Sequence, residues 1–321
     1  MQRIQCMLVA AAALIATGAA HAQTYPAKPV RYVVGFVAGG NADSLGRLVA
    51  ARLGEILGQQ VVVENRPGAA AMVATDLVAK SSPDGYTILQ AGATFATNPA
   101  LRKSVPYDAQ KDFAPVSMIA RVANVFAVHP SLPAKSVGEF VAYAKARPGQ
   151  ITYGTPGVGS TGHLTVALLQ SMTGIVLSHV PYKGGAPALT DLIGGQITAL
   201  CDNVPSPMPY IKSGRIRALG VTSAQRVPQL PEVPTIAESG VPGFDVASWY
   251  AVWTPAGTPQ AIITKLNASV VAALGTPDVK QRITDLGYVP TSSTVAELAA
   301  ILSSETVQWA KVVKEAGIAQ E

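Results

Sequence analysis

The sequence has few of the residues on which metal centres, disulfides and most catalytic sites depend. It contains two cysteines and four histidines, and one of each lies in a predicted leader. The single remaining thiol, Cys201, excludes an intrachain disulfide. The remaining histidines, His129, His163 and His179, show no metal-ligand spacing, and no H-E-x-x-H or S-x-x-K motif is present. We therefore expect no metal and no cofactor.

Charge is also sparse. Only 13% of the residues are charged, and the 24 Lys and Arg against 19 Asp and Glu give a formal net charge of +5. The basic residues are scattered and form no stripe with interleaved aromatic residues, which disfavours nucleic-acid binding. A mild positive excess is compatible with a small anionic ligand.

The first 22 residues predict export. Arg3 gives a basic start, an apolar run extends from Met7 to Ile15, and Ala20-His21-Ala22 forms a small-x-small cleavage site. The run is shorter than the ~20 residues that a membrane span needs. Cleavage after Ala22 would leave 321 − 22 = 299 residues with a charge of (24 − 1) − 19 = +4 in the periplasm. Since no second apolar span follows, we expect a soluble mature protein.

Short β-branched runs alternate with longer amphipathic runs along the mature chain. Strands are predicted at Val30–Val34, Val61–Glu64 and Thr87–Ala91, around helices at Asp43–Gly58 and Ala69–Ser81. This βαβαβ order predicts a parallel sheet with right-handed crossovers. A long strand at 122–129 then leads into a second series, whose predicted elements are Ser136–Ala146, Ile151–Gly154, Ser160–Thr173, Ile175–Val180, Ala186–Ile193, Ile197–Asp202, Pro207–Ser213 and Arg217–Thr222.

Two lobes are expected from this order and from a length near 300 residues. A segment rich in Pro and Gly at 226–242 is predicted to cross back to the first lobe, followed by helices at Pro259–Leu274, Pro277–Leu286 and Thr294–Ala316. The predicted division is a signal peptide at 1–22, a first lobe of 23–123 plus 230–321, and a second lobe of 124–229.

A glycine-rich loop joins the first predicted strand to the first helix. Around Gly39-Gly40, unpaired N–H groups and the helix dipole would favour an anion, and glycine allows its close approach. The alternative is an ordinary turn in which Asp43 caps the helix.

A second loop, from Thr155 to His163, has the same setting. Gly157, Gly159 and Gly162 match G-x-G-x-x-G, but no acidic residue ends the next strand, so a dinucleotide site is disfavoured. The loop also lacks G-x-S-x-G, which disfavours a hydrolase. Its hydroxyl and N–H groups are better interpreted as donors to a carboxylate.

Two residues outside these loops are further candidates. Asp202 ends a predicted strand, where α/β ligand crevices form. Because an ionised carboxylate repels an anion, it would hold a ligand hydroxyl, fix a water or orient loop amides; a strand-end cap is the alternative. Tyr182 offers a hydroxyl beside Lys183 in the turn before a helix, although this lysine can equally be a solvated turn residue.

An ordered set of short motifs along the mature chain resembles one family, the solute receptors of tripartite tricarboxylate transporters, often called the Bug family. No single motif is decisive, but the series is specific. It comprises Gly39-Gly40 with Asp43, Glu64–Gly68, Asp84–Thr87, Asn98-Pro99, Gly157–Leu164, His179–Gly184, Arg217–Thr222, Pro231–Thr235 and Pro255–Pro259.

The resemblance implies a two-lobed periplasmic-binding-protein fold, type II-like, with a hinge and a ligand cleft between α/β lobes. It also implies delivery of a small carboxylate to membrane permease subunits. The ligand-binding residues that it implies are Phe36, Ala38, Gly39, Asp43, Gly157, Gly159, Ser160, Thr161, His163 and Asp202. To these we add Tyr182 and, as a departure from the family pattern, Asn41.

Three departures bear on the ligand. Val37 replaces a usual proline, Asn41 replaces a small residue and adds an amide, and Cys201 stands where an aromatic residue is more common. They concern which aliphatic or aromatic acid is bound rather than the class of protein.

The predicted function is therefore capture of an organic carboxylate by hinge closure in a monomeric, non-enzymatic periplasmic receptor. One alternative is a receptor that reports ligand to a membrane signalling protein, which genomic neighbours encoding permease subunits would argue against. The other is a secreted hydrolase, which would lose turnover of an ester or amide in Ser160→Ala.

Overall fold

The structure is a computed structural model that describes residues 25–315. The predicted signal peptide at residues 1–22 and its cleavage site therefore lie outside the described residues. No helix between residues 25 and 315 combines the length and the apolar character needed to cross a membrane.

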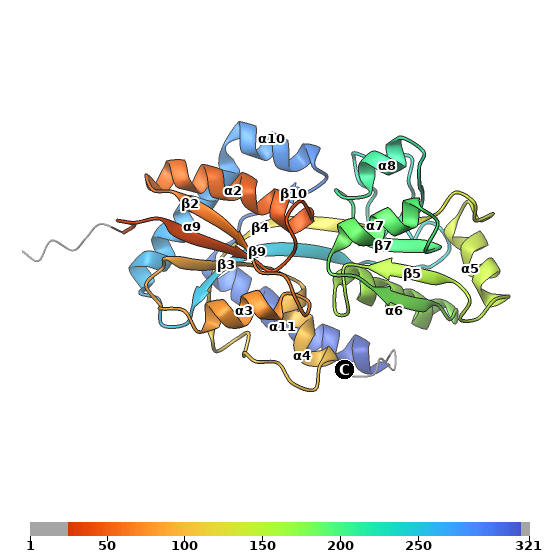
Figure 1. The fold of residues 1–321 in the computed structure, drawn as a ribbon, viewed down its shortest axis with the longest axis horizontal. Coiled ribbons are helices and arrows are strands. Elements are labelled where there is room, and N and C mark those ends of the chain that lie inside the picture. Colours follow the sequence, from red (N-terminus) through yellow and green to blue (C-terminus); the bar gives the residue numbers. More distant parts are fainter. Residues whose placement is uncertain (1–24, 316–321) are drawn as a thin grey trace, which may run out of the picture.

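One long strand, β4 (Phe113–Val128), belongs to both halves of the molecule (Figure 1). Its first part, up to Ala123, pairs with β9 (Ala247–Pro255). Its last part pairs with β7 (Ala199–Asn203) and β8 (Arg217–Val221). The strand thus joins two α/β lobes, and the predicted two-lobed fold is confirmed.

The first lobe contains the strand order β2-β1-β3-β9-β4. Strand β1 (Val30–Val34) lies parallel to β2 (Val61–Asn65) and β3 (Thr87–Gly92), as predicted. Strand β9, together with the short β10 (Val289–Pro290), is antiparallel to β4, and neither was predicted as a strand. One face carries α2 (Asn41–Leu57), α9 (Gln260–Gly275) and α10 (Pro277–Asp285), and the other carries α3 (Met72–Ala79), α4 (Thr94–Leu101) and α11 (Val295–Glu315).

The second lobe continues through β7 to β5 (Thr152–Thr155) and β6 (Ser178–Pro181), which are parallel to each other. Its four helices divide between the two faces of the sheet. They are α5 (Val137–Lys145) and α6 (Thr161–Thr173) on one face, and α7 (Gly185–Ile193) and α8 (Met208–Lys212) on the other.

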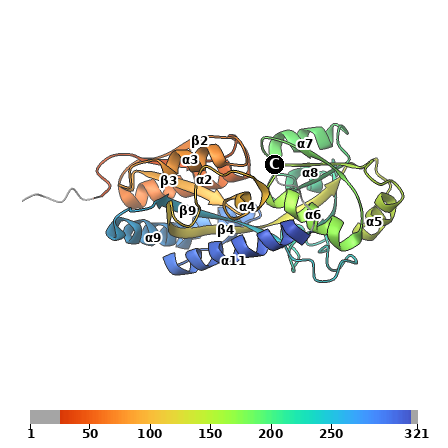
Figure 2. The same cartoon turned by 90° about the horizontal axis from the view of Figure 1, so that it is seen from below.

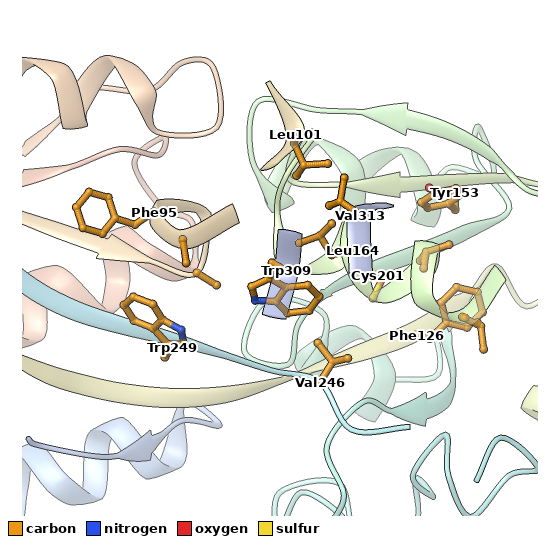
Figure 3. Packing of buried hydrophobic residues seen from close by; sticks show 14 of the residues in the cluster. Phe95, Leu101, Phe126, Tyr153, Leu164, Cys201, Val246, Trp249, Trp309 and Val313 are labelled. Atoms are coloured by element: carbon orange, nitrogen blue, oxygen red, sulfur yellow. The ribbon is translucent and has the colours of Figure 1, made fainter. Parts of the chain in front are cut away.

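A single apolar cluster extends from one lobe into the other. Phe95 and Trp249 of the first lobe belong to it, as do Tyr153 and Phe126 of the second (Figure 3). Trp309 of α11 lies between these groups, and Figure 2 shows α11 running beside β4 toward α6. Because burial of apolar surface is the main stabilising term in folding, this cluster supports both lobes at once.

Three local features differ from the sequence predictions. Helix α3 begins at Met72, because Ala69, Ala70 and Ala71 have positive φ angles of 47°, 51° and 70° that no α-helix contains. Helix α4 was not predicted, since its internal Pro99 argues against a helix. Strand β9 lies between the predicted crossing segment at 226–242 and the helix predicted from Pro259, where no element was predicted.

The return to the first lobe occurs later than expected. The segment 226–242 remains on the second lobe, where Ile236 N donates to Val221 O at 2.9 Å. The crossing itself lies at Val246-Ala247, since Val246 N donates to Thr222 O at 2.8 Å and β9 begins at the next residue. The division at residues 123/124 and 229/230 remains a prediction.

Substitution of Gly162 tests the packing of the second glycine loop on the sheet. A Cβ there would lie 2.1 Å from the carbonyl oxygen of Cys201, so α6 must move away from β7. We expect Gly162→Ala to lower the free energy of unfolding by about 2–3 kcal/mol, measured by urea denaturation. Gly275→Ala is the matched control, because nothing lies within 4 Å of a Cβ there, and it should change stability by less than about 1 kcal/mol. Equal stability of the two variants would contradict this packing.

Candidate functional site

A cavity lies between the lobes, at the carboxyl ends of the parallel strands, which is where α/β folds form ligand crevices. The first lobe contributes Phe36, Val37, Gly40, Asn41, Ala42, Gly92, Ala93, Thr94, Ser248 and Tyr250. The second lobe contributes Pro156, Ser160, Thr161, Gly184, Gly185, Asp202 and Asn203.

Four helices begin at this cavity. The first residues of α2, α4, α6 and α7 are Asn41, Thr94, Thr161 and Gly185, and all four line the wall. The first N–H groups of a helix have no partner within the helix, and the helix dipole makes this end partly positive. The arrangement therefore favours a negatively charged ligand, although no Lys, Arg or His is among the described lining residues.

The first glycine loop is held by Asp43, which is not among the residues that line the cavity. Its carboxylate accepts from Gly39 N at 2.9 Å, from Asn65 Nδ2 at 2.9 Å and from Arg47 Nε at 2.9 Å. Burial alone raises the pKa of Asp43, but the hydrogen bonds from Arg47, Gly39 and Asn65 lower it below its ordinary value. Asp43 is therefore an anion that fixes the loop in which Gly39 adopts a φ of 79°.

The second glycine loop is held by residues of its own helix. Ser160 is the N-cap of α6: its Oγ accepts from His163 N at 3.3 Å and donates to Gly157 O at 2.7 Å. The Nδ1 atom of His163 accepts from Gly159 N at 3.3 Å. Gly159 has a φ of 83°, a conformation that glycine adopts without strain.

The ring of the buried His163 stacks on that of the half-buried His179. The His163 and His179 rings are 4.3 Å apart, and His179 Nε2 lies 2.7 Å from Thr155 Oγ1. Burial lowers the pKa of His163 to about 4. Burial and the neighbouring His163 together lower the pKa of His179 to about 3. Both rings are therefore neutral at pH 7 and act as hydrogen-bonding parts of the loop.

Asp202 lies in the cavity wall at the end of β7. Its Oδ1 accepts from Asn203 N at 2.7 Å, and Asn41 Nδ2 of the first lobe is 3.4 Å from both carboxylate oxygens. Burial raises the pKa of Asp202 to about 7, although hydrogen bonds from Asn203, Ser206 and Asn41 lower it. The side chain thus contacts both lobes and titrates near neutrality.

Further hydrogen bonds join the lobes around the cavity. Tyr250 Oη of the first lobe donates to Asn203 Oδ1 at 2.8 Å, and Thr97 Oγ1 of α4 donates to Gly159 O at 2.8 Å. Together with the contact between Asn41 and Asp202, these hydrogen bonds connect the two lobes on either side of the cavity. Strand β4, which joins the two lobes, contacts the cavity wall: Asn203 Nδ2 donates to Asn124 Oδ1 of β4 at 2.6 Å.

The structure brings part of the predicted site into the cavity wall. Phe36, Asn41, Ser160, Thr161 and Asp202 line it. The other predicted residues lie outside the lining, and these are Ala38, Gly39, Asp43, Gly157, Gly159, His163 and Tyr182.

The predicted site residues outside the lining lie at the loop surface, in an adjacent hollow or at buried positions. Ala38 and Gly39 are exposed at the first loop, and Gly157 and Tyr182 line an adjacent hollow that also contains Lys183. Tyr182 Oη donates to Asp191 at 2.6 Å. Sequence reasoning missed several lining residues, among them Thr94, Asn203 and Ser248. Asn203 follows Asp202 at a strand end and was open to detection, whereas Thr94 belongs to the unpredicted helix α4.

No metal centre is evident in the described part of the chain. Between residues 25 and 315, no group of three or more His, Cys, Asp or Glu side chains is placed to hold a metal ion. Cys201 is buried as a free thiol in the apolar cluster.

A two-lobed α/β fold with an interlobe cavity surrounded by helix N-termini is the architecture of a solute-binding protein. The sequence profile of the tripartite tricarboxylate transporter family receptors (TctC) matches residues 45–318. The chain belongs to this family, and the predicted resemblance is confirmed.

Solved structures agree with this assignment. A protein of R. palustris solved with adipate is 42% identical, with a TM-score of 0.90 over 92% of this chain and 100% of its own. The periplasmic binding protein BugD is 36% identical, with a TM-score of 0.88 over 92% of this chain and 100% of its own. The malate-bound MatC of Rhodopseudomonas palustris is 32% identical, with a TM-score of 0.86 over 90% of this chain and 100% of its own.

The two stacked histidines predict how stability depends on pH. Their pKa values are lower in the folded protein than in the unfolded chain, so the unfolded chain takes up protons first as pH falls. The stability that the two histidines contribute should therefore fall from pH 6.5 toward pH 4, although the raised pKa of Asp202 acts in the opposite sense and offsets part of this fall; urea denaturation at several pH values would measure the sum. His179→Gln should make this fall smaller. An equally steep fall in the variant would show that His179 does not titrate in this way.

Proposed function

We propose that this protein is a periplasmic receptor that captures a small organic carboxylate between its lobes and delivers it to membrane permease subunits. The observation that carries the proposal is the convergence of the N-termini of α2, α4, α6 and α7 on one interlobe cavity. The adipate and malate of the related structures, the family of receptors and the predicted signal peptide support it.

Backbone N–H groups do most of the binding in this proposal. A micromolar ligand requires about 8 kcal/mol. Hydrogen bonds to a charged group contribute roughly 1.5–3 kcal/mol each, so several helix-terminal N–H groups must act together. The hydroxyl group of Thr161 and the amide of Asn41 add polar contacts, and Phe36 supplies an apolar wall for the carbon skeleton. Ser160, whose hydroxyl proton goes to Gly157 O, caps the start of α6 in the wall.

The predicted residues outside the lining have a supporting role in this proposal. Asp43 and His163 position the two glycine loops through Gly39 and Gly159. A loop fixed before the ligand arrives needs no further ordering when it binds, which raises affinity.

In this proposal, ligand binding changes the conformation of the protein through closure of the two lobes about a hinge. Strand β4 and the segment at Val246-Ala247 cross between the lobes, and the cavity wall contains residues of both lobes. A ligand held by α2 of the first lobe and α6 of the second binds the closed form more tightly than the open form, and therefore shifts the equilibrium toward closure. The closed form is then the one that the permease subunits recognise.

The polar groups of the second loop support binding rather than catalysis. Ser160 Oγ interacts with backbone atoms of Gly157 and His163, and His163 Nδ1 accepts from Gly159 N. A nucleophile needs its hydroxyl hydrogen-bonded to a general base, and neither of these bonds supplies one.

Binding can be tested with the purified mature protein and a panel of carboxylates. We expect aliphatic or aromatic mono-, di- or tricarboxylates to raise its melting temperature, because a ligand that binds only the folded state stabilises it. Thr161→Val, which removes a hydroxyl from the cavity wall, should weaken the best ligand about tenfold in calorimetry. Thr173→Val lies at the other end of α6 outside the wall and is the matched control. Absence of stabilisation by every acid in the panel would reject the proposed function.

A further inference from the structure

Asp202 is a carboxylate inside a cavity that is built for a carboxylate. Its side chain is only 2% exposed and lines the wall together with Asn41 and Gly185. A Cβ at Gly185 would lie 2.0 Å from Asp202 Oδ2, so the carboxylate is in contact with the first residue of α7. An anionic ligand in the same cavity would therefore lie close to a second carboxylate.

Among the described neighbours of Asp202, no charged side chain compensates this pair. The titratable neighbours of Asp202 are Cys201 on β7, Tyr250 on β9 and Tyr288 before β10, and burial raises the pKa of each, so all three are neutral at pH 7. From α2 the facing group is the neutral amide of Asn41, and the acid of that helix, Asp43, is paired with Arg47 outside the cavity wall.

The remaining neighbours are the N-terminus of α7, which carries no charged side chain in its first turn, and Ser206 after β7. The α7 dipole favours an ionised Asp202, but burial has the larger effect and the pKa of Asp202 is raised to about 7. Asp202 is therefore partly protonated near pH 7 before any ligand arrives.

Two carboxylates in one buried site do not both stay ionised, because their repulsion and the loss of hydration favour sharing of a proton. The ligand carboxylate can take the free helix-terminal N–H groups, whereas Asp202 Oδ1 is already bonded to Asn203 N. We propose that the receptor binds its carboxylate together with one proton, which is carried by Asp202 and donated in a hydrogen bond to the ligand. This inference rests on the proposed function and identifies the ionisation state that the site selects.

The step is a proton uptake without any change of covalent bonds in the ligand. Solvent supplies the proton, the Asp202 carboxylate becomes a carboxyl group, and its O–H donates to a carboxylate oxygen of the ligand. A neutral O–H donor replaces a repelling charge, so affinity depends on the fraction of molecules with Asp202 protonated. The loaded cavity then holds only the negative charge of the ligand itself, because Asp202 adds none.

The experiment is calorimetry of the wild-type mature protein with adipate and with malate at pH 6.5, 7, 8 and 8.5. Each titration is made in two buffers of different ionisation enthalpy, so that the heat reports protons taken up. With a pKa of about 7 for free Asp202, we expect uptake of about half a proton per ligand at pH 7 and close to one at pH 8. The dissociation constant should rise about 20-fold between pH 6.5 and pH 8.5.

The variant Asp202→Asn keeps the shape of the side chain and removes the titration. It should bind without proton uptake and with the same affinity at pH 6.5 and pH 8.5. Asp278→Asn, an exposed position at the start of α10, is the matched control and should retain the wild-type pH dependence. If Asp202→Asn does not fold, the proton uptake of the wild-type protein still decides whether binding is proton-coupled.

The outcomes separate this inference from the proposed function. Carboxylate binding without proton uptake, and with an affinity independent of pH, overturns the inference and leaves the receptor function intact; Asp202 would then accept a hydrogen bond from a ligand hydroxyl. Uptake that persists in Asp202→Asn places the proton on another group and also overturns it. Absence of binding to adipate, malate and the wider panel at every pH rejects the function itself.

Discussion

The burial of negative charge without a cationic side chain is the constraint on which the rest of this structure depends. The described cavity wall contains no Lys, Arg or His, so the favourable potential has to come from the backbone. Backbone N–H groups become available where helices begin, and α2, α4, α6 and α7 all begin at the cavity. Each lobe contributes two of these helices, α2 and α4 from the first and α6 and α7 from the second. In the proposed mechanism, hinge closure therefore doubles the number of helix N-termini around the ligand, so that affinity depends on the closed conformation.

Such a site requires rigid loops, and each lobe provides the rigidity differently. In the first lobe an ionised Asp43 holds Gly39 and is itself held by Arg47 and Asn65. In the second lobe the neutral His163 holds Gly159. The charge of each anchor depends on its burial. The half-exposed Arg47 keeps Asp43 charged, whereas the stacked rings of His163 and His179 are desolvated and therefore neutral. Neither anchor lines the cavity, although both are among the ligand-binding residues that the resemblance implies.

How far the sequence predicts this arrangement depends on the range of the interactions involved. The βαβ elements and the two glycine loops follow from local periodicity and turn chemistry, and the Ser160 cap of α6 is visible in four consecutive residues. Helix α4 was missed because Pro99 argues locally against a helix. Strand β9 was missed because it is defined by pairing with β3 and β4, which are far away in the sequence. Thr94 and Ser248 could therefore not be assigned to the cavity, since both depend on these elements.

The three departures from the family pattern now differ in meaning. Cys201 lies in the apolar cluster beneath α6 and is outside the cavity wall, so its replacement of an aromatic residue concerns packing. Val37 and Asn41 line the wall, and the Val37 side chain lies 3.0 Å from where a Cβ of Gly184 would be. Asn41 presents an amide to Asp202 across the cleft. In the proposed receptor, selection among carboxylates therefore falls to these two first-lobe residues and to the ionisation state of Asp202.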